Sequence, residues 1–345
     1  IDTMNRTRRT AVRVATAAVS GAVSCLAFQH VVGTPLGRAH CRALAMGAGA
    51  STTSVPLASS IKTPHFPTTV LVHGLDSSKE TWGGLLSELN RAGYPAIALD
   101  LRGHGESKLG CPSDFGPETL ARDIIDAVRA QNLDPVVLVG HSMGGRVAMH
   151  VADIASRENL GLLAAVVIED MDVSERPGAL PPDHELTDDQ KLRLAAFEAD
   201  NGRLFGSWDA CRDALLPWYN EDARRVDSWK NTRVRQVASG WWSDINPAAH
   251  RLARNTILAS PASSDAWNRL GKCTALPFSI HLWVADKPGS VCKWEGEGGI
   301  EDMGKRLPAA KTHEFKNSAH SIHNSAKQEY LEALVHVIRS AAAIT

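Results

Sequence analysis

The sequence contains few cysteines and no pair of them in a CxxC spacing. Its six cysteines are Cys25, Cys41, Cys111, Cys211, Cys273 and Cys292. The first two lie within the first sixty residues, and the other four are widely separated. Such a pattern indicates neither a zinc site nor a disulfide framework. A secreted fold held together by disulfides is therefore not expected.

The chain also lacks a large excess of charge of either sign. Its 37 Lys and Arg residues and 38 Asp and Glu residues leave a formal net charge of −1. Nucleic-acid binding needs a concentrated basic face to hold phosphates, and no basic run occurs beyond the N-terminus. This excludes nucleic acid as the main partner. A hydrophobic content of 43% and a charged content of 22% are typical of a globular enzyme.

Acidic residues are almost absent from the beginning of the chain, where none occurs between Asp2 and Asp76. The basic residues of the first sixty positions are Arg6, Arg8, Arg9, Arg13, Arg38 and Arg42. A segment rich in Arg, Ala, Ser and Thr and poor in acids is typical of an organellar transit peptide. Residues 1–60 are therefore predicted to be a cleaved, disordered leader that directs the protein to a plastid or a mitochondrion.

Long apolar runs are missing as well. The stretch AVRVATAAVSGAVSCLAF (11–28) has a basic flank and a weakly apolar centre, so it could act as a signal peptide, alone or ahead of a transit peptide. A membrane anchor within residues 11–32, or placement in the endomembrane system, is the alternative. Because Arg13 and many small polar residues interrupt the stretch, no stable membrane span is expected.

From residue 69 onward, short apolar runs alternate with helical patterns. The apolar runs occupy residues 69–74, 96–100, 136–140, 164–170, 278–286 and 311–316, and helical patterns occupy residues 79–93, 116–132 and 142–157. Short β-branched runs separated by amphipathic helices indicate a parallel sheet with crossover helices. The predicted fold class is α/β.

The pattern changes between residues 176 and 265. No strand-like run is recognised there, and the segment holds most of the tryptophans of the chain. It is interpreted as a helical cap, or lid, inserted into a core formed by residues 61–175 and 266–345. Nothing in the sequence indicates the oligomeric state.

The stretch VVLVGHSMGGRVAM (136–149) joins an apolar strand to a helix through a serine flanked by glycines. A sharp strand-to-helix turn strains the backbone of its central residue and tolerates only small residues two positions before and after it. Gly140 and Gly144 meet this requirement. Ser142 is therefore predicted to be a nucleophile, and the next backbone N–H lies at a helix N-terminus, where it can stabilise an oxyanion.

Together with two further motifs, this turn resembles the α/β-hydrolase superfamily, from about residue 66 to the C-terminus. VLVHGLDSSKETW (70–82) is similar to the oxyanion loop of the family, and LDLRGHGES (99–107) is similar to its DxRGxGxS turn. The resemblance implies a mostly parallel sheet flanked by helices, with an oxyanion hole made by the backbone N–H groups of Leu75 and Met143. It implies no metal and no organic cofactor. His73 and His104 are interpreted as structural residues, and His141 as a structural or pocket-lining residue.

A serine hydroxyl needs an adjacent base, and the segment NSAHSIHNS (317–325) offers two histidines. Family members carry the catalytic histidine in a GHxxH-like loop between the last strand and the last helix. Here Ala319 stands where glycine is usual, and His320 matches the first histidine of that loop. His323, just before residues that resemble helix caps, is the less favoured candidate.

Two carboxylates compete for the third position. The usual family position follows the penultimate strand, but in VADKPGSVC (284–292) Asp286 comes early. In a second family arrangement the acid follows the strand after the serine, and VVIEDMDV (166–173) resembles it, as does the serine-containing turn after the later strand. The match favours Asp170, with Glu169 and Asp172 as neighbours and Asp286 as the alternative acid.

The residues thus predict a serine hydrolase that acts through Ser142, His320 and Asp170, and the family resemblance implies a carboxylic ester or thioester as the group that it cleaves. Its substrate is expected to be a small molecule with an apolar acyl or aromatic group. Acyl transfer, C–C bond hydrolysis or cofactor-free perhydrolysis by the same residues are alternatives. A non-catalytic binding protein on a hydrolase fold is a second alternative.

Overall fold

A computed structural model describes residues 66–343 of the chain. The predicted leader, residues 1–60, and the alternative anchor within residues 11–32 lie outside the described residues. Within residues 66–343, no helix combines the length and the apolar content that crossing a lipid bilayer requires.

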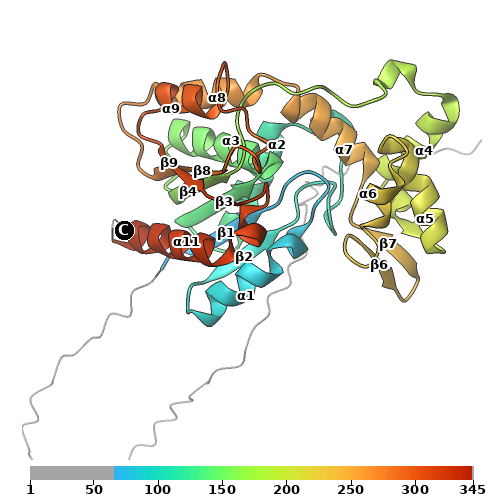
Figure 1. The fold of residues 1–345 in the computed structure, drawn as a ribbon, viewed down its shortest axis with the longest axis horizontal. Helices are drawn as coiled ribbons and strands as arrows, with labels where there is room; N and C mark the ends of the chain where they lie inside the picture. Colours follow the sequence, from blue (N-terminus) through green and yellow to red (C-terminus); the bar gives the residue numbers. More distant parts are fainter. Residues whose placement is uncertain (1–65, 344–345) are drawn as a thin grey trace, which may run out of the picture.

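The centre of the molecule is a six-stranded sheet in which all neighbouring strands run parallel, in the order β2-β1-β3-β4-β8-β9 (Figure 1). The strands are β1 (Thr68–Val72), β2 (Ala96–Leu99), β3 (Val136–His141), β4 (Leu163–Glu169), β8 (Ser279–Ala285) and β9 (Lys311–Phe315). Each of the predicted apolar runs forms one of them. The α/β fold class is confirmed.

Helices cover both faces of this sheet (Figure 1). On one face lie α2 (Pro117–Ala130), α3 (Met143–Arg157), α8 (Ala262–Gly271) and α9 (Ile300–Arg306), and on the other lie α1 (Gly83–Arg91) and α11 (Lys327–Ala342). Side chains alternate along a strand, so Val70 and Val72 join the core on the first face while Leu71 joins the core on the second. The sheet is therefore buried on both sides, as its apolar strands require.

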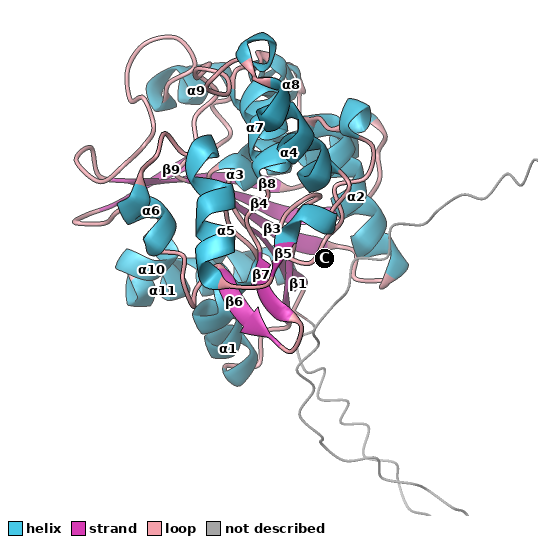
Figure 2. Cartoon of the chain, turned by 90° about the vertical axis from the view of Figure 1, so that its right-hand side faces the viewer, coloured by secondary structure: helices cyan, strands magenta, loops and turns pink. Residues whose placement is uncertain are grey.

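The segment between β4 and α8 contains helices and a second, smaller sheet (Figure 2). Its helices are α4 (Asp188–Glu198), α5 (Trp208–Leu215), α6 (Ala223–Asp227) and α7 (Pro247–Ala253), the last continued by a π-helical turn at Arg254–Leu258. Its strands β5 (Leu204–Phe205), β6 (Val234–Val237) and β7 (Gly240–Ser243) pair antiparallel in the order β5-β7-β6.

The prediction that this segment lacks strands is therefore wrong. Each of the three strands has four residues or fewer, and they lie within a charged sequence that reads as helical. A stretch this short shows too few alternations for a period of two residues to stand out. In the structure, β7 pairs with a partner strand on each side.

Close backbone packing fixes the turn between β3 and α3. A Cβ atom on Gly140 would lie 2.3 Å from the carbonyl oxygen of Gly144. A Cβ atom on Gly144 would lie 2.5 Å from the carbonyl oxygen of His73 and 2.8 Å from that of Val72. These neighbours are main-chain atoms, which have no alternative rotamer that would remove the overlap, so both positions require glycine.

We expect Gly144→Ala to lower the free energy of unfolding by about 2 kcal/mol or more, because the new methyl group overlaps the backbone after β1. Gly84→Ala is the matched control, because a Cβ at Gly84 in α1 meets no atom within 4 Å. The control should leave stability unchanged or raise it by up to about 1 kcal/mol. Urea unfolding of the two variants measures the difference, and equal midpoints would contradict the steric argument.

His150 shows how burial makes the stability of the fold depend on pH. It lies buried in α3, with its Nε2 atom 3.4 Å from Ser263 Oγ of α8. Burial lowers the pKa of His150 from 6.5 to about 4, so the folded protein holds the neutral ring while the unfolded chain takes up a proton. The resulting stabilisation is fully present above about pH 6.5 and is lost progressively as the pH falls toward 4.

Because of His150, the free energy of unfolding of the wild type should therefore fall by about 1 kcal/mol as the pH is lowered from about 7.5 to 5.5. The variant His150→Gln should lose about that much less than the wild type over the same interval, since glutamine does not titrate. Urea unfolding at both pH values tests this expectation. The same pH dependence in both proteins would show that His150 does not contribute.

Candidate active site

Ser142 and Asp170 leave the central sheet at neighbouring points. β3 and β4 pair with His141 opposite Glu169, so the next residue of each strand lies just beyond the carboxyl edge of the sheet. The φ angles of Ser142 and Asp170 are 54° and 45°, in a region that non-glycine residues adopt only where their surroundings enforce it. Ligands of open parallel sheets bind at this edge.

The Asp170 carboxylate binds the imidazole of His320. The distance from His320 Nδ1 to Asp170 Oδ2 is 2.7 Å. Ser290 Oγ and the Ala285 N–H donate to Oδ1 at 2.6 and 3.0 Å, and the Val291 N–H donates to Oδ2 at 3.0 Å. Burial acts to raise the pKa of the Asp170 carboxyl, but the hydrogen bonds outweigh it and hold the pKa below its ordinary value. Asp170 is therefore a buried, charged hydrogen-bond acceptor.

The loop that carries His320 lies against the residue before Ser142. His141 Nε2 is 3.1 Å from the carbonyl oxygen of His320, and the two rings are 4.6 Å apart. Burial lowers the pKa of His141 to about 4, so the neutral ring donates its Nε2–H to that carbonyl. Within residues 66–343, neither His320 Nε2 nor Ser142 Oγ has a hydrogen-bond partner. Catalytic hydrogen bonds of this kind often form only once a substrate is bound.

The loop of residues 73–78, here called the oxyanion loop, passes directly beside the serine. A Cβ atom on Gly74 would lie 2.9 Å from the Cβ atom of Ser142. Leu75 comes next in this loop. On the other side of the serine, Met143 begins α3, and the first N–H groups of a helix have no partner within it. The predicted donors, the N–H groups of Leu75 and Met143, thus belong to the two chain segments that adjoin Ser142.

His73 holds the oxyanion loop in place. Its Nδ1 lies 2.7 Å from the carbonyl oxygen of Gly74, and its Nε2 accepts a hydrogen bond of 3.0 Å from the Leu101 N–H. Burial lowers the pKa of His73 to about 3, so the ring is neutral and can donate at one nitrogen and accept at the other. His104 makes a similar local contact, with its Nδ1 3.0 Å from the carbonyl oxygen of Arg102. Both histidines hold loops, as the sequence suggests.

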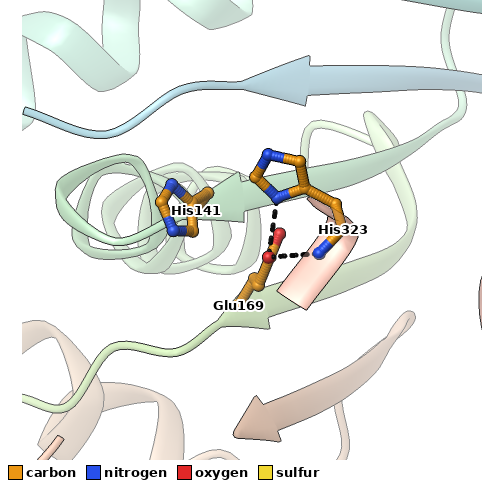
Figure 3. A group of neighbouring side chains, drawn as sticks. All are labelled: His141, Glu169 and His323. Carbon is orange, nitrogen blue, oxygen red and sulfur yellow. Dashed lines mark hydrogen bonds and ion pairs between the residues drawn. The ribbon is translucent and has the colours of Figure 1, made fainter. Parts of the chain in front are cut away.

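Glu169 and His323 form a second carboxylate–histidine pair, which Figure 3 shows together with His141. Glu169 Oε1 accepts hydrogen bonds from His323 Nδ1 at 2.7 Å and from the His323 N–H at 3.0 Å, while Oε2 accepts one from the Tyr330 hydroxyl at 2.9 Å. Burial acts to raise the pKa of Glu169, but the neighbouring imidazoles of His323 and His141 outweigh it and lower the pKa. The pair thus attaches the loop that carries His320 and His323 to the end of β4.

His141, Glu169 and His323 could also hold a metal ion, because each offers a ligand atom within 4.8 Å of the others (Figure 3). Two imidazoles and a carboxylate suit zinc and similar ions. The hydrogen bonds already satisfy both carboxylate oxygens, so they account for this group of side chains without an ion.

The other candidate acids contact different groups. Asp286 Oδ2 accepts a hydrogen bond of 2.9 Å from the Asn317 N–H and makes no hydrogen bond to His320 within residues 66–343. Asp172 Oδ1 accepts from the Ser174 hydroxyl at 2.9 Å and from Arg176 at 2.7 Å. Both carboxylates hold loops, and Asp170 is the acid that contacts His320.

Sequence reasoning missed the Glu169–His323 pair and the contacts of Asp76. A signal for the pair was present, since two consecutive acids end β4 and two histidines lie three residues apart after β9. Asp76 is conspicuous only as an acid directly after Leu75. Its partners lie more than 140 residues away in the chain, and no local pattern identifies them.

Comparison with known proteins gives a family and several partial matches. The family model described as the alpha/beta hydrolase family matches residues 69–333. Protein phosphatase methylesterase 1 of Homo sapiens is 40% identical over 90 residues, which cover 25% of this chain and 23% of that protein. The esterase Rv0045c of Mycobacterium tuberculosis is 26% identical over 198 residues, which cover 52% of this chain and 62% of that protein. The chain thus spans about a quarter of the length of the methylesterases that it matches.

Solved structures share the fold at low sequence identity. The structure of the M. tuberculosis esterase Rv0045c superposes with a TM-score of 0.53 and 22% identity, covering 79% of this chain and 86% of that one. A marine microorganism esterase gives a TM-score of 0.53 and 17% identity, covering 79% and 95%. The family match extends over most of the chain and includes β1, the turn at Ser142 and the His320 loop, so the chain belongs to the alpha/beta hydrolase family.

Proposed function

We propose that this protein is a serine hydrolase that cleaves carboxylic esters or thioesters through an acyl-enzyme intermediate. The observation that carries the proposal is the 2.7 Å contact between buried Asp170 and His320, next to the strained turn at Ser142. The esterase and methylesterase names of several relatives support an ester as the substrate.

In the first half of the proposed reaction, the Ser142 hydroxyl attacks the acyl carbonyl carbon and His320 Nε2 takes its proton. Negative charge then develops on the carbonyl oxygen, where the backbone N–H groups of Leu75 and Met143 donate hydrogen bonds. The intermediate collapses, His320 returns the proton to the leaving alcohol or thiol, and the acyl group stays on Ser142.

In the second half, water attacks the acyl-enzyme while His320 takes a proton from it. The bond between the acyl carbon and Ser142 Oγ then breaks, His320 returns the proton to Oγ, and the carboxylic acid leaves. Asp170 orients the imidazole through Nδ1 and stabilises its protonated form. Its lowered pKa supports this role, because the carboxylate stays charged at neutral pH. The scheme needs no metal and no organic cofactor.

Residues 176–265 are proposed to form a cap over this site, inserted between core segments 61–175 and 266–345. The separate β5-β7-β6 sheet supports this division. So does the contact of Arg203 Nη1 with the carbonyl oxygen of Gly105, at 2.7 Å, which holds the segment on a loop of the core. The tryptophans of the cap favour a small-molecule substrate with an apolar acyl or aromatic group.

A fluorophosphonate probe and an aryl ester substrate test the nucleophile. We expect the wild-type protein to be labelled once per chain and to hydrolyse short aryl oxyesters or thioesters. Ser142→Ala should show neither labelling nor turnover above background, because no other group in the scheme can form the covalent bond. An unlabelled wild type, or equal labelling of Ser142→Ala, would contradict the proposal.

The acid is tested by comparing Asp170→Asn with Asp286→Asn on the same aryl ester. Asp170→Asn should lower kcat by about a thousandfold to ten-thousandfold, because the amide no longer favours the required tautomer and charge of His320. Asp286→Asn is the matched control, since its carboxylate contacts a loop N–H, and its kcat should stay within about threefold of the wild-type value. A thousandfold loss in Asp286→Asn alone would reverse the assignment.

A further inference from the structure

Asp76 lies where the oxyanion loop meets the cap. It directly follows Leu75 in a turn, with a φ of 52°, a left-handed conformation that aspartate adopts more readily than most residues. Only 6% of its side chain is exposed. A buried carboxylate is stable only when hydrogen bonds and opposite charges replace the water it has lost.

Three side chains of the cap provide these partners. The Tyr219 hydroxyl donates to Asp76 Oδ1 at 2.9 Å, Arg225 Nη2 donates to Oδ2 at 2.9 Å, and His250 Nδ1 is 3.0 Å from both oxygens. Arg225 belongs to α6, His250 belongs to α7, and Tyr219 lies just before α6. One carboxylate therefore joins three parts of the cap to the oxyanion loop.

The cap partners of Asp76 also pack against one another. The Tyr219 ring makes edge contacts with the rings of Trp229 and His250, at centroid distances of 4.7 and 5.0 Å. The Arg225 guanidinium lies 4.9 Å above the Tyr219 ring. This packing holds the donors together as one group, so the position of the cap determines where the Asp76 carboxylate is held.

The pKa values of Asp76 and Tyr219 keep the first an acceptor and the second a donor. Burial acts to raise the pKa of the Asp76 carboxyl, but its interactions with His250, Arg225 and Tyr219 outweigh burial and hold the pKa well below the ordinary value. Burial and the nearby Asp76 carboxylate raise the pKa of Tyr219 well above its ordinary value. Asp76 thus remains an acceptor and Tyr219 remains a donor at neutral pH.

We propose that Asp76 is a positioning residue, which orients the Leu75 N–H through its contacts with the cap, so that the oxyanion hole is complete only when the cap is docked. This inference rests on the proposed function. Leu75 and Asp76 share one turn, so releasing the carboxylate allows the Leu75 backbone to rotate. A donor must lie about 2.7–3.1 Å from the developing charge, and a misplacement of about 1 Å can cost a hundredfold in rate.

Another charged contact of the cap supplies a control. Arg235 of β6 binds Asp244 Oδ1 at 2.6 Å and Glu106 Oε1 at 3.0 Å. It joins the cap to the loop after β2 without contacting Asp76. Arg235→Gln removes a cap–core ion pair of the same type. Asp244 also accepts hydrogen bonds from Ser78 Oγ of the oxyanion loop at 3.2 Å and from Trp242 Nε1 at 3.1 Å. Both contacts remain in this variant, so the turn at Leu75 and Asp76 should be unchanged.

The test uses the full chain with an aryl ester and a trifluoromethyl ketone inhibitor, which adds to Ser142 and places an oxyanion in the same hole. Asp76→Asn should lower kcat about tenfold to a hundredfold with little change in KM, and should weaken the inhibitor by a similar factor. Tyr219→Phe should act in the same direction with a smaller effect. Arg235→Gln should change both quantities by less than about twofold.

A double variant tests whether the cap contact carries the effect. Once Asp76→Ala has removed both carboxylate oxygens, adding Tyr219→Phe should change kcat little, because the Tyr219 hydroxyl then has no Asp76 oxygen left to bind. The inference would be overturned if the losses in kcat from the two substitutions multiplied in the double variant. It would also be overturned if Asp76→Asn lost kcat without weaker inhibitor binding, or if its kcat equalled that of the wild type. If Asp76→Asn does not fold, wild-type values in both Tyr219→Phe and Arg225→Gln would overturn it.

The wild type separates this inference from the function on which it rests. If the wild type neither hydrolyses esters nor binds the inhibitor at Ser142, the proposed function fails and the inference fails with it. If the wild type does both and Asp76→Asn behaves like it, only the role of Asp76 is rejected.

Discussion

The register between β3 and β4 determines the whole arrangement of the candidate site. Because His141 pairs with Glu169, Ser142 and Asp170 follow at adjacent points of the sheet edge, and both have positive φ angles there. A shift of this register by one residue would turn each side chain to the other face of its strand. Many weak apolar contacts in the core thus fix the two polar groups on which the proposed chemistry depends.

Buried carboxylates connect parts of the molecule that are distant in sequence, through hydrogen bonds and ion pairs. Glu169 and Asp170 are consecutive, yet they bind His323 and His320 respectively, so the His320 loop is attached at two points. Asp76 similarly joins the loop of residues 73–78 to Tyr219 and His250 of the segment 176–265. Such a connection is hard to break, because a carboxylate left unpaired in the interior strongly destabilises the fold.

The sequence predicted the central sheet well because its strands are β-branched, buried on both faces and separated by amphipathic helices. It also selected Asp170 and His320, which the structure brings to 2.7 Å. It missed β5, β6 and β7, which are too short to show a period. The contacts of Asp76 were not predictable either, because they join loops and helices whose approach depends on how the whole segment 176–265 packs.

The separation of Asp170 and His320 along the chain, 150 residues, bears on how the protein is made. The ribosome releases the serine turn and the carboxylate long before the histidine, which follows the last strand. Until β9 emerges, β8 presents an unpaired strand edge to its surroundings, and such edges promote aggregation. Completion of the sheet and completion of the site are therefore the same late event in synthesis.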